Sequence, residues 1–479
     1  MTNASLLPLD RLPHAPGRLP VLGDLASVDR HHPTQHEVLL SRSLGPIFQR
    51  KLLQSRVIVV AGAHLAAQAC DETYWARCLA GPGETLRGFV PAGLFTARSR
   101  DPLWGMAHRI LSPGFTQASM RTYHEAMLTV ADDLTNAWAV APGGRIDVHA
   151  DMTAATLEVI ARAGFGRPFG LLGHAGDVPD SRWFVEALAR ILRWASDQTN
   201  DLPILGALRT RVQAPRMRRD VATARAFVDE IIAQRRASGR RDTGDLLGLM
   251  LETEDPETGE RLPDSNIRDQ TLTFLVAGHE TTAALLEAAL HYIAADPALQ
   301  DRLRAEVTAR GGWDYDAVTG MRAIRNVLNE TLRLHPPVPG LFRVARQDRP
   351  LGGYLIPQGR AVFLLSLAAQ SDPQVWGSDA DRFDPDRFQA ARLREFPDRW
   401  WHPFGTGPRS CIGMAFAMHE ATLLVGRIVS SYQLELPVSL NSDHSAPTLR
   451  MHERGSLRPE PYQLLASPIA HPIHERTRP

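Results

Sequence analysis

A single cysteine near the C-terminus stands in a segment that could hold a metal ion. Cys411 ends a glycine-rich run, FGTGPRSC, and an apolar pattern with helical spacing continues from Ile412 to Tyr432. The first turn of a helix has free amide hydrogens and positive potential, so we expect it to lower the pKa of the Cys411 thiol. The resulting thiolate would be a ligand for a transition metal. The alternative is a structural cysteine that packs as a small hydrophobic side chain.

Polar groups in the middle of a long helix form a second candidate site. Residues 264–295 carry an uninterrupted helical pattern between Pro263 and Pro297, and a helix of this length spans about 45 Å. Its centre reads Ala277-Gly278-His279-Glu280-Thr281-Thr282, where glycine and paired threonines cost helix stability and buried polar groups would need partners. This composition indicates selection for chemistry. The alternative is a helix exposed at its middle, with threonine hydroxyls bonded back to the preceding turn.

Two further pairs of side chains each share one face of a helix. Glu330 and Arg333 are three residues apart, and Trp104 and His108 are four apart. Such pairs are usually solvated and stabilise a helix by about 0.2–0.5 kcal/mol, so neither pair is informative alone. The first pair gains weight because a His-Pro-Pro turn follows it and a later FDPDRF run contains Arg387.

The composition narrows the class of protein. Acidic and basic residues number 53 each in 479 residues, so no net charge favours nucleic acid or an anionic membrane as a partner. Three scattered cysteines cannot build a disulfide framework or a tetrahedral zinc site, which suggests a reducing compartment. The first ten residues lack a basic flank and a long apolar run. We therefore expect a cytoplasmic protein with neither a secretory signal nor a membrane anchor.

The elements that would position these side chains are mostly helices. Helical periodicity marks four long segments besides the central helix, namely residues 120–140, 152–163, 217–236 and 412–432. Segments rich in β-formers occur near residues 45–61 and 361–367. Residues 1–23 are rich in Pro and Gly and predict an extended arm. We predict a mainly α fold with small β-sheets and one catalytic domain over residues 1–479, since no repeat or low-complexity linker interrupts the chain.

Together these patterns resemble the cytochrome P450 family. The run at Cys411 is similar to the haem-binding signature of the family at six positions, which are Phe404, Gly405, Gly407, Arg409, Cys411 and Gly413. The central helix resembles the oxygen-binding helix of the family, and the Glu330 segment with Arg387 resembles its Glu-x-x-Arg and arginine network. The resemblance runs from about Pro16 to Leu465. It implies the cytochrome P450 fold, a single large domain with a long central oxygen-binding helix, and haem b as the cofactor.

The resemblance also implies roles for individual residues. Cys411 would be the proximal ligand to the haem iron, and its electron donation would favour O–O cleavage. Glu280 and Thr281 would deliver protons to bound oxygen, whereas His279 would be structural. The other haem contacts would be Phe404, Gly405, Arg409, Ile412, Trp104, His108, Arg343, Ala277 and Gly278. The substrate pocket would be lined by Leu94, Phe95, Ala277 and Thr281. A structural network would consist of Glu330, Arg333 and Arg387.

These inferences predict a monooxygenase that activates O2 to oxidise, and most often to hydroxylate, an apolar small molecule. We expect electrons from a separate ferredoxin or flavodoxin, because too few residues follow the haem-binding helix for a fused reductase. The chain is similar to soluble bacterial fatty-acid hydroxylase haem domains, yet Ser55 and Val59 replace the Arg and Tyr that hold a carboxylate there. The expected substrate is therefore a secondary metabolite such as a terpenoid. The alternatives are a fatty-acid hydroxylase, a peroxide-driven peroxygenase and a non-catalytic haem sensor or electron carrier.

Overall fold

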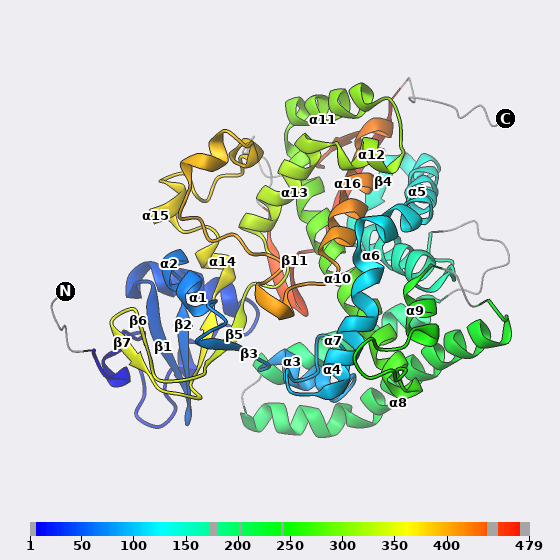
Figure 1. Cartoon of the computed structure of the whole chain (residues 1–479). Helices are drawn as coiled ribbons and strands as arrows, with labels where there is room; N and C mark the ends of the chain where they lie inside the picture. The colour runs from blue at the N-terminus through cyan, green and yellow to red at the C-terminus, as the bar shows by residue number, and fades with distance from the viewer. Residues whose placement is uncertain (1–5, 173–180, 201–202, 241–243, 438–448, 470–479) are drawn as a thin grey trace, which may run out of the picture.

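The computed structural model describes residues 6–172, 181–200, 203–240, 244–437 and 449–469. Within these ranges the chain is mainly helical with four small β-sheets, as the sequence predicts. Most strands gather at one end of the molecule and the long helices fill the other (Figure 1). Residues 1–5 of the predicted arm lie outside the described ranges. Residues 6–23 are irregular apart from a short 3₁₀ turn at Leu9–Arg11 and isolated bridges.

The largest sheet holds five strands in the order β1-β2-β8-β5-β3. The β-rich segment near residues 45–61 forms an antiparallel hairpin of β1 (Ile47–Leu52) and β2 (Ser55–Val60). The second predicted segment forms β8 (Ala361–Leu364), which lies between β2 and β5 (Leu341–Ala345). At the edge, β3 (Trp75–Cys78) pairs with β5 so that Arg77 stands opposite Arg343. Directly opposed residues share a face of the sheet, so this register brings two arginines together.

The remaining strands form three small sheets. One holds β4 (Arg145–Asp147), β12 (Gln463–Pro468) and β9 (Tyr432–Glu435). A second pairs β6 (Arg349–Leu351) with β7 (Tyr354–Ile356). The third is a hairpin of β10 (Met451–Arg454) and β11 (Ser456–Pro459), and β11 packs against the central helix.

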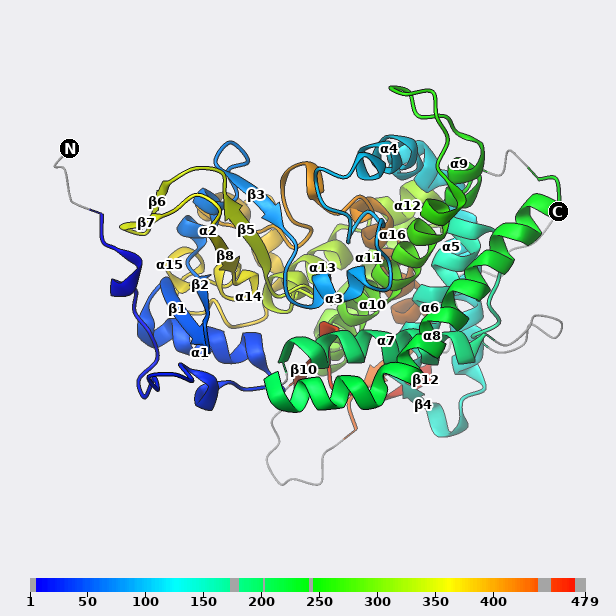
Figure 2. The same cartoon turned by 90° about the horizontal axis from the view of Figure 1, so that it is seen from below.

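The central helix, α10 (Asp264–Ala295), has the bounds that the sequence predicts. It packs against α6 (Val148–Val159), α13 (Arg322–Leu334) and α16 (Met414–Ser431), while α5 (Gln117–Ala139) packs against α6 and α16. The other helices are α1 (Pro33–Leu44), α2 (Ala63–Ala69), α3 (Pro82–Arg87), α4 (Pro102–Leu111), α7 (Arg182–Asn200), α8 (Pro203–Ala237), α9 (Leu246–Glu252), α11 (Pro297–Arg310), α12 (Tyr315–Thr319), α14 (Ser366–Ala369) and α15 (Pro373–Trp376). Figure 2 shows α7 and α8 packed side by side. Within the described ranges, no helix combines the length and the hydropathy needed to cross a membrane.

The predicted helix over residues 152–163 ends differently in the structure. It is regular only to Val159 and then widens into a π turn, Ile160–Gly164. One extra residue in a turn does not change the apolar pattern enough to be seen in the sequence. The π turn packs against α10, and shortly before it Thr156 Oγ1 donates a hydrogen bond to the carbonyl oxygen of His279 at 3.2 Å. A Cβ on Gly278 would be 3.8 Å from Ile160, an ordinary contact. Packing therefore does not require the glycine.

The loop that carries Leu94 and Phe95 is fastened to α10. The amide of Ala92 donates to Asp269 at 2.9 Å, and the amide of Leu94 donates to Gln270 Oε1 at 2.8 Å. Between them Gly93 approaches α10 so closely that a Cβ there would clash with Thr273 Oγ1. The close approach of two backbones thus explains the glycine.

Replacement of Gly93 by alanine is expected to destabilise the protein by about 1–3 kcal/mol, the usual cost of overpacking. Urea unfolding of the wild type and the variant measures this difference. Gly312→Ala is the matched control, because a Cβ at Gly312 would meet only Asp314 Oδ2, at 3.7 Å. The control should change the free energy of unfolding by no more than about 0.5 kcal/mol. Equal loss in both variants would contradict the explanation.

Candidate functional site

The loop before Cys411 is shaped by two glycines. Gly405 and Gly407 have φ angles of +74° and +68°, a region that other residues rarely adopt. A Cβ on Gly407 would also clash with the carboxylate of Glu72. The loop closes on itself because the amide of Cys411 donates to the carbonyl oxygen of Phe404 at 2.8 Å. These constraints hold Cys411 in place, and the residue keeps exposed surface.

The relation of Cys411 to the following helix corrects the sequence prediction. Helix α16 begins at Met414 with Gly413 as its N-cap, so Cys411 precedes the helix instead of opening it. The predicted lowering of the thiol pKa is wrong. Although the residue keeps exposed surface, the many protein atoms around its sulfur desolvate the thiolate and raise the pKa of Cys411, and the hydrogen bond from the Gly413 amide only partly offsets this effect. Deprotonation of the sulfur therefore needs a further positive charge, such as that of a bound metal ion.

The middle of α10 is the part of this helix that reaches open space. Ala277 is exposed and Gly278 and Thr281 are half-buried, whereas residues 271–275 and 282–291 are buried. Thr281 Oγ1 donates to the carbonyl oxygen of Ala277 at 2.8 Å, which is the back-bonding that the sequence left open as an alternative. The helix remains continuous there. His279 is buried and its Nδ1 is hydrogen-bonded to the carbonyl oxygen of Leu275, so it is not available as a metal ligand at this opening.

Cys411 and the middle of α10 lie in the same region of the molecule. Phe115 links them, because its ring centroid is 5.7 Å from that of Phe274, one turn before Gly278 on α10. On the other side, a Cβ on Gly413 would lie 3.9 Å from both the Cys411 sulfur and the Phe115 ring. Helices α10 and α16 also pack together near the centre of the molecule (Figure 1). The fold thus brings together two motifs that are far apart in the sequence.

Glu280 points from α10 toward the β10–β11 hairpin. Its carboxylate accepts hydrogen bonds from Ser456 Oγ at 2.9 Å and from Arg458 Nη1 at 3.1 Å. Burial acts to raise the pKa of Glu280, but the charge of Arg458, the nearby His279 and the Ser456 hydroxyl outweigh it and hold the pKa below its ordinary value. Glu280 is therefore ionised at neutral pH. Sequence reasoning missed Arg458, because no local pattern links a C-terminal strand to the centre of α10.

A group of basic side chains lies between the Cys411 loop and α4. The guanidinium carbon of Arg409 is 4.6 Å from the centroid of the Trp104 ring, and its Nη2 donates to the carbonyl oxygens of Leu94 and Ala97 at 2.9 Å. Trp104 and His108 share a face of α4, with ring centroids 5.1 Å apart. Burial and the charge of Arg409 lower the pKa of His108. The structure thus brings these three predicted residues together.

Two more arginines join this group from the β3–β5 edge. Arg343 pairs with Glu72 at 2.6 Å and donates through Nη2 to Thr406 Oγ1 in the glycine-rich loop, also at 2.6 Å. Arg77, opposite Arg343 in the register, was missed by sequence reasoning because only the pairing of the two strands places it there. Burial and the charge of Arg343 lower the pKa of Arg77 to about 10. Burial and the charge of Arg77 lower that of Arg409 to about 9.

This arginine group, defined as Arg77, Arg343 and Arg409, fits an anionic ligand. Among the described residues, the one ion pair to these three side chains is that of Glu72 with Arg343. The Nε of Arg343 is buried without a hydrogen-bond partner. Burial is the larger cause of the lowered pKa values of Arg77 and Arg409, and repulsion between neighbouring cations adds to it. Carboxylates placed among the arginines would relieve this repulsion. Haem b carries propionate groups, so the residues present fit this cofactor.

The predicted pocket residues Leu94 and Phe95 follow the loop fastened to α10. Leu94 packs partly buried against the main hydrophobic core, whereas Phe95 is 44% exposed. Arg77 donates to the carbonyl oxygen of Phe95 at 2.6 Å, and its guanidinium carbon is 5.2 Å from the centroid of the Phe95 ring. Phe95 therefore lies beside the arginine group.

The structure brings Glu330, Arg333 and Arg387 together in a buried network. Arg333 donates to both carboxylate oxygens of Glu330, at 2.7 and 2.8 Å, and to the carbonyl oxygen of Ala380 at 2.6 Å. The Nε of Arg387 is 3.6 Å from Glu330, and its Nη2 is 2.6 Å from Asp379. Burial raises the pKa of Glu330 and outweighs the arginines, which lower it. Glu330 and Arg333 have no exposed side-chain surface, so neither charge is screened by water.

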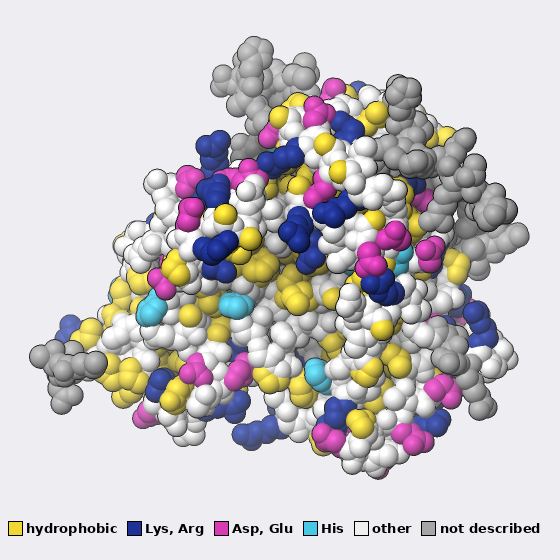
Figure 3. Space-filling model, turned by 45° about the horizontal axis from the view of Figure 1, so that its top comes forward, with side chains coloured by type: hydrophobic (Ala, Val, Ile, Leu, Met, Phe, Trp, Pro, Cys, Tyr) yellow, Lys and Arg dark blue, Asp and Glu magenta, His cyan; other side chains and the backbone are white. Residues whose placement is uncertain are grey.

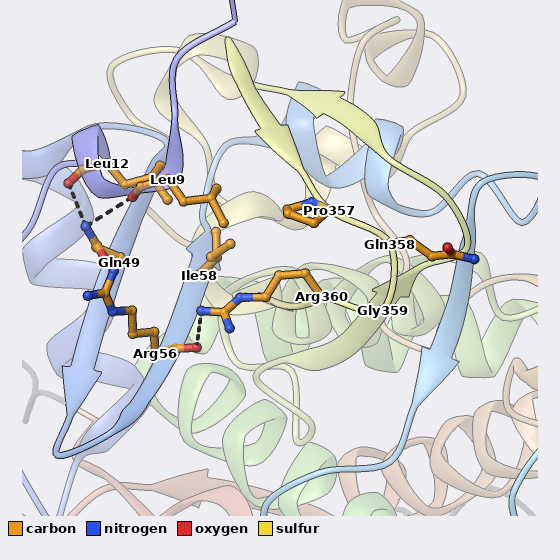
Figure 4. A pocket seen from close by; sticks show the side chains of 9 residues that line it. All are labelled: Leu9, Leu12, Gln49, Arg56, Ile58, Pro357, Gln358, Gly359 and Arg360. Carbon is orange, nitrogen blue, oxygen red and sulfur yellow. Dashed lines mark hydrogen bonds between the residues drawn. The ribbon is translucent and has the colours of Figure 1, made fainter.

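Two cavities of the described structure lie away from the candidate site. One of about 430 Å³ lies between the N-terminal segment and the five-stranded sheet, with Leu9, Leu12 and Ile58 on one side and Arg56 and Arg360 below them (Figure 4). Another, of about 390 Å³, is lined by residues of α3, α7 and α8. Neither contains a residue that the sequence predicts for the site. The chemistry of the side chains, not the size of a cavity, therefore identifies the candidate site.

Comparison with known proteins confirms the predicted family. Residues 13–466 match the family model described as Cytochrome P450. A bifunctional cytochrome P450/NADPH–P450 reductase of Bacillus cereus is 36% identical over 464 residues, which cover 94% of this chain and 42% of the relative. One of Bacillus subtilis is 37% identical over 451 residues, which cover 92% of this chain and 41% of the relative. The chain therefore spans about two fifths of the length of these curated relatives.

The fold agrees with the sequence comparison. A crystal structure of a cytochrome P450 matches with a TM-score of 0.86 at 34% identity, covering 96% of this chain and 99% of that chain. The residues matched by the family model, 13–466, include the cysteine loop, the central helix and the strands that carry the arginine group. The chain is a member of the cytochrome P450 family.

Proposed function

We propose that the protein is a haem-thiolate monooxygenase that uses O2 and two electrons to oxidise an apolar small molecule. The observation that carries this proposal is the placement of Cys411, held by the closed glycine-rich loop and exposed, in the same region as the exposed middle of α10. The cysteine side offers one sulfur ligand. The α10 side offers Ala277 and Gly278, whose side chains hold no metal-binding atom, so this side would stay free for O2. A haem electron carrier whose iron is bound by two protein side chains would need a metal-binding side chain on the α10 side.

Haem b would be held at its iron by Cys411 and at its propionates by basic residues. The propionate contacts would come from the arginine group together with Trp104 and His108. The faces of the haem would pack against Phe404, Gly405 and Ile412 on one side and Ala277 and Gly278 on the other. When bound, haem supplies the redox chemistry that activates O2.

Two side chains of α10 would manage protons. The Thr281 hydroxyl, bonded to the preceding turn, can rotate to donate toward the opening beside Ala277. Glu280, ionised in its ion pair, can accept a proton and pass it on. An enzyme that takes its oxygen from peroxide does not need this acid and alcohol pair, so the pair supports the use of O2. Leu94, Phe95, Ala277 and Thr281 would line the substrate pocket.

The electrons would come from a ferredoxin or a flavodoxin. A reductase is the second candidate, because the bifunctional relatives are named for a reductase as well as a cytochrome P450. Acidic and basic side chains are mixed over the face shown in Figure 3, so a docking surface there would be a local patch. The substrate would be a secondary metabolite such as a terpenoid, with a fatty acid as the alternative. The protein would act in the cytoplasm.

Spectroscopy and turnover test the proposal. The reduced, purified holoprotein should show with carbon monoxide the red-shifted absorption of a sulfur-ligated haem. Terpenoids and fatty acids are then screened by shifts of the ferric Soret band, and products of turnover with O2 and a ferredoxin or flavodoxin system are identified by mass spectrometry. Turnover with hydrogen peroxide alone would favour a peroxygenase. A holoprotein that no ligand perturbs and that forms no product would overturn the proposal in favour of a haem sensor or electron carrier.

A further inference from the structure

A buried cation connects the central helix to the C-terminal hairpin. Arg458 of β11 is 3% exposed and donates to two carboxylates of α10, Glu280 and Glu287, which lie about two turns apart and so face the same strand. Its Nη2 also donates to Thr153 Oγ1 on α6 at 2.6 Å. Arg458 thus connects β11, α10 and α6 at the position where the side chain of Glu280, the predicted proton-delivery acid, projects from α10.

The two carboxylates are held unequally. Glu287 is 1% exposed and accepts from both Nε and Nη2 of Arg458, with Nε 3.0 Å from each carboxylate oxygen. From Arg458, Glu280 accepts a hydrogen bond from Nη1 alone, at 3.1 Å, and the Glu280 side chain is 16% exposed. The other oxygen of Glu280 is held by the neutral hydroxyl of Ser456. If Glu280 rotated away, Arg458 would still have a charged partner.

The groups that act on Glu280 come from every element packed around it. They are His279 on α10, His149 on α6, His452 on β10, and Ser456 and Arg458 on β11. Glu287 shares Arg458 with Glu280, and Arg454 acts on His452. After burial, which raises the pKa of Glu280, the charge of Arg458 is the largest effect and lowers it. Without Arg458, the desolvated carboxylate of Glu280 would face mainly histidines, which carry full positive charge only in acid. Burial would then raise the pKa of Glu280 with little to oppose it.

We propose that Arg458 is a positioning residue for proton delivery, anchored permanently by Glu287 and bound exchangeably to Glu280. This inference rests on the proposed function, in which Glu280 relays protons. To relay a proton, the Glu280 side chain must rotate between the side where it accepts the proton and the side where it donates it. A counter-ion with no other partner would hold Glu280 too tightly, since breaking a buried pair leaves an uncompensated charge. Glu287 removes that penalty. Arg458 can therefore keep Glu280 ionised at rest and still release it.

Infrared difference spectroscopy tests the hold of Arg458 on Glu280 without turnover. The C=O stretch of a protonated carboxyl is assigned to Glu280 by its loss in Glu280→Gln. Near neutral pH the wild-type holoprotein should show no such band, because the charge of Arg458 keeps Glu280 ionised. Loss of an opposite charge at this distance raises a carboxyl pKa by about 1–3 units. Arg458→Gln should show the band, whereas Arg458→Lys and Glu287→Gln should not.

The product formed per electron pair tests the exchange. It should fall about tenfold in Arg458→Gln, because a buried acid that keeps its proton is a poor relay, and should recover partly in Arg458→Lys. It should also fall several-fold in Glu287→Gln, where Glu280 stays ionised but becomes the main partner of Arg458. Arg235→Gln is the matched control, since it breaks a buried ion pair, with Asp245 at 2.7 Å, away from this hairpin. The control should lose stability and keep its product yield.

The outcomes separate the inference from the proposed function. If Arg458→Gln shows no Glu280 band, or if Glu287→Gln keeps the wild-type yield, the inference is wrong while a productive wild type leaves the monooxygenase proposal intact. If the wild type forms no product from any substrate tested, the monooxygenase proposal fails, and the infrared band alone decides whether Arg458 holds Glu280 ionised.

Discussion

Replacement of Cys411 by serine is expected to remove the red-shifted carbon monoxide band and to lower product formation by more than about 100-fold. Changes in residues that only support a metal ligand typically cost 10- to 100-fold, and loss of the ligand itself should cost more. The physical reason is that the thiolate donates electron density to the iron, which an alcohol does not do at neutral pH. Absorption spectra of the reduced, carbon monoxide-treated protein and product yield measure the two effects.

Cys70→Ser is the matched control for this substitution. Cys70 is a free, half-buried cysteine at the end of α2, so it undergoes the same change from thiol to hydroxyl outside the glycine-rich loop itself. The control should keep both the band and the yield. A Cys411→Ser variant that retained the sulfur-ligand spectrum would show that another residue binds the iron.

Replacement of Arg333 by methionine is expected to destabilise the protein by about 3–5 kcal/mol, the cost of leaving a buried charge without its partner. Glu330 would keep the amide of Asp384 at 3.0 Å and the more distant Arg387. Methionine fills a similar volume, so the loss would come from the charge and not from a cavity. Urea unfolding followed by circular dichroism measures the change in the free energy of unfolding.

The loss in the Arg333 variant should grow with pH. Glu330 already has a pKa above its ordinary value because of burial, and removal of Arg333 would raise it further. A group whose folded-state pKa is raised loses stability as the pH rises through the range between its unfolded and folded values. The variant should therefore be closer to the wild type in mildly acidic buffer than in alkaline buffer.

Arg392→Met is the control for a surface ion pair. Arg392 pairs with Asp384 at 2.7 Å, but its side chain is 37% exposed, so its loss should cost no more than about 1 kcal/mol. The double variant Glu330→Gln, Arg333→Met should recover part of the loss, since it removes the uncompensated charge. Equal effects of Arg333→Met and Arg392→Met would contradict the view that burial sets the strength of this network.

Local patterns in the sequence were enough to predict the main helices and strands and most of the residues of the candidate site. The bounds of α10 follow from an apolar period between two prolines, and the loop at Cys411 follows from glycines that adopt positive φ. Both features depend on interactions between near neighbours in the chain, which a single sequence displays. The family could be identified from the same motifs. One catalytic domain over residues 1–479 stays a prediction.

Tertiary structure decided what depends on burial and on distant partners. The pKa of Cys411 is raised because desolvation outweighs the nearby helix, and the sequence shows the helix but not the burial. Arg77 joins the arginine group only through the register of β3 on β5. Arg458 reaches Glu280 only because the C-terminal hairpin packs on α10. Each depends on segments far apart along the chain, whose contacts and solvent exclusion no local period in the sequence encodes.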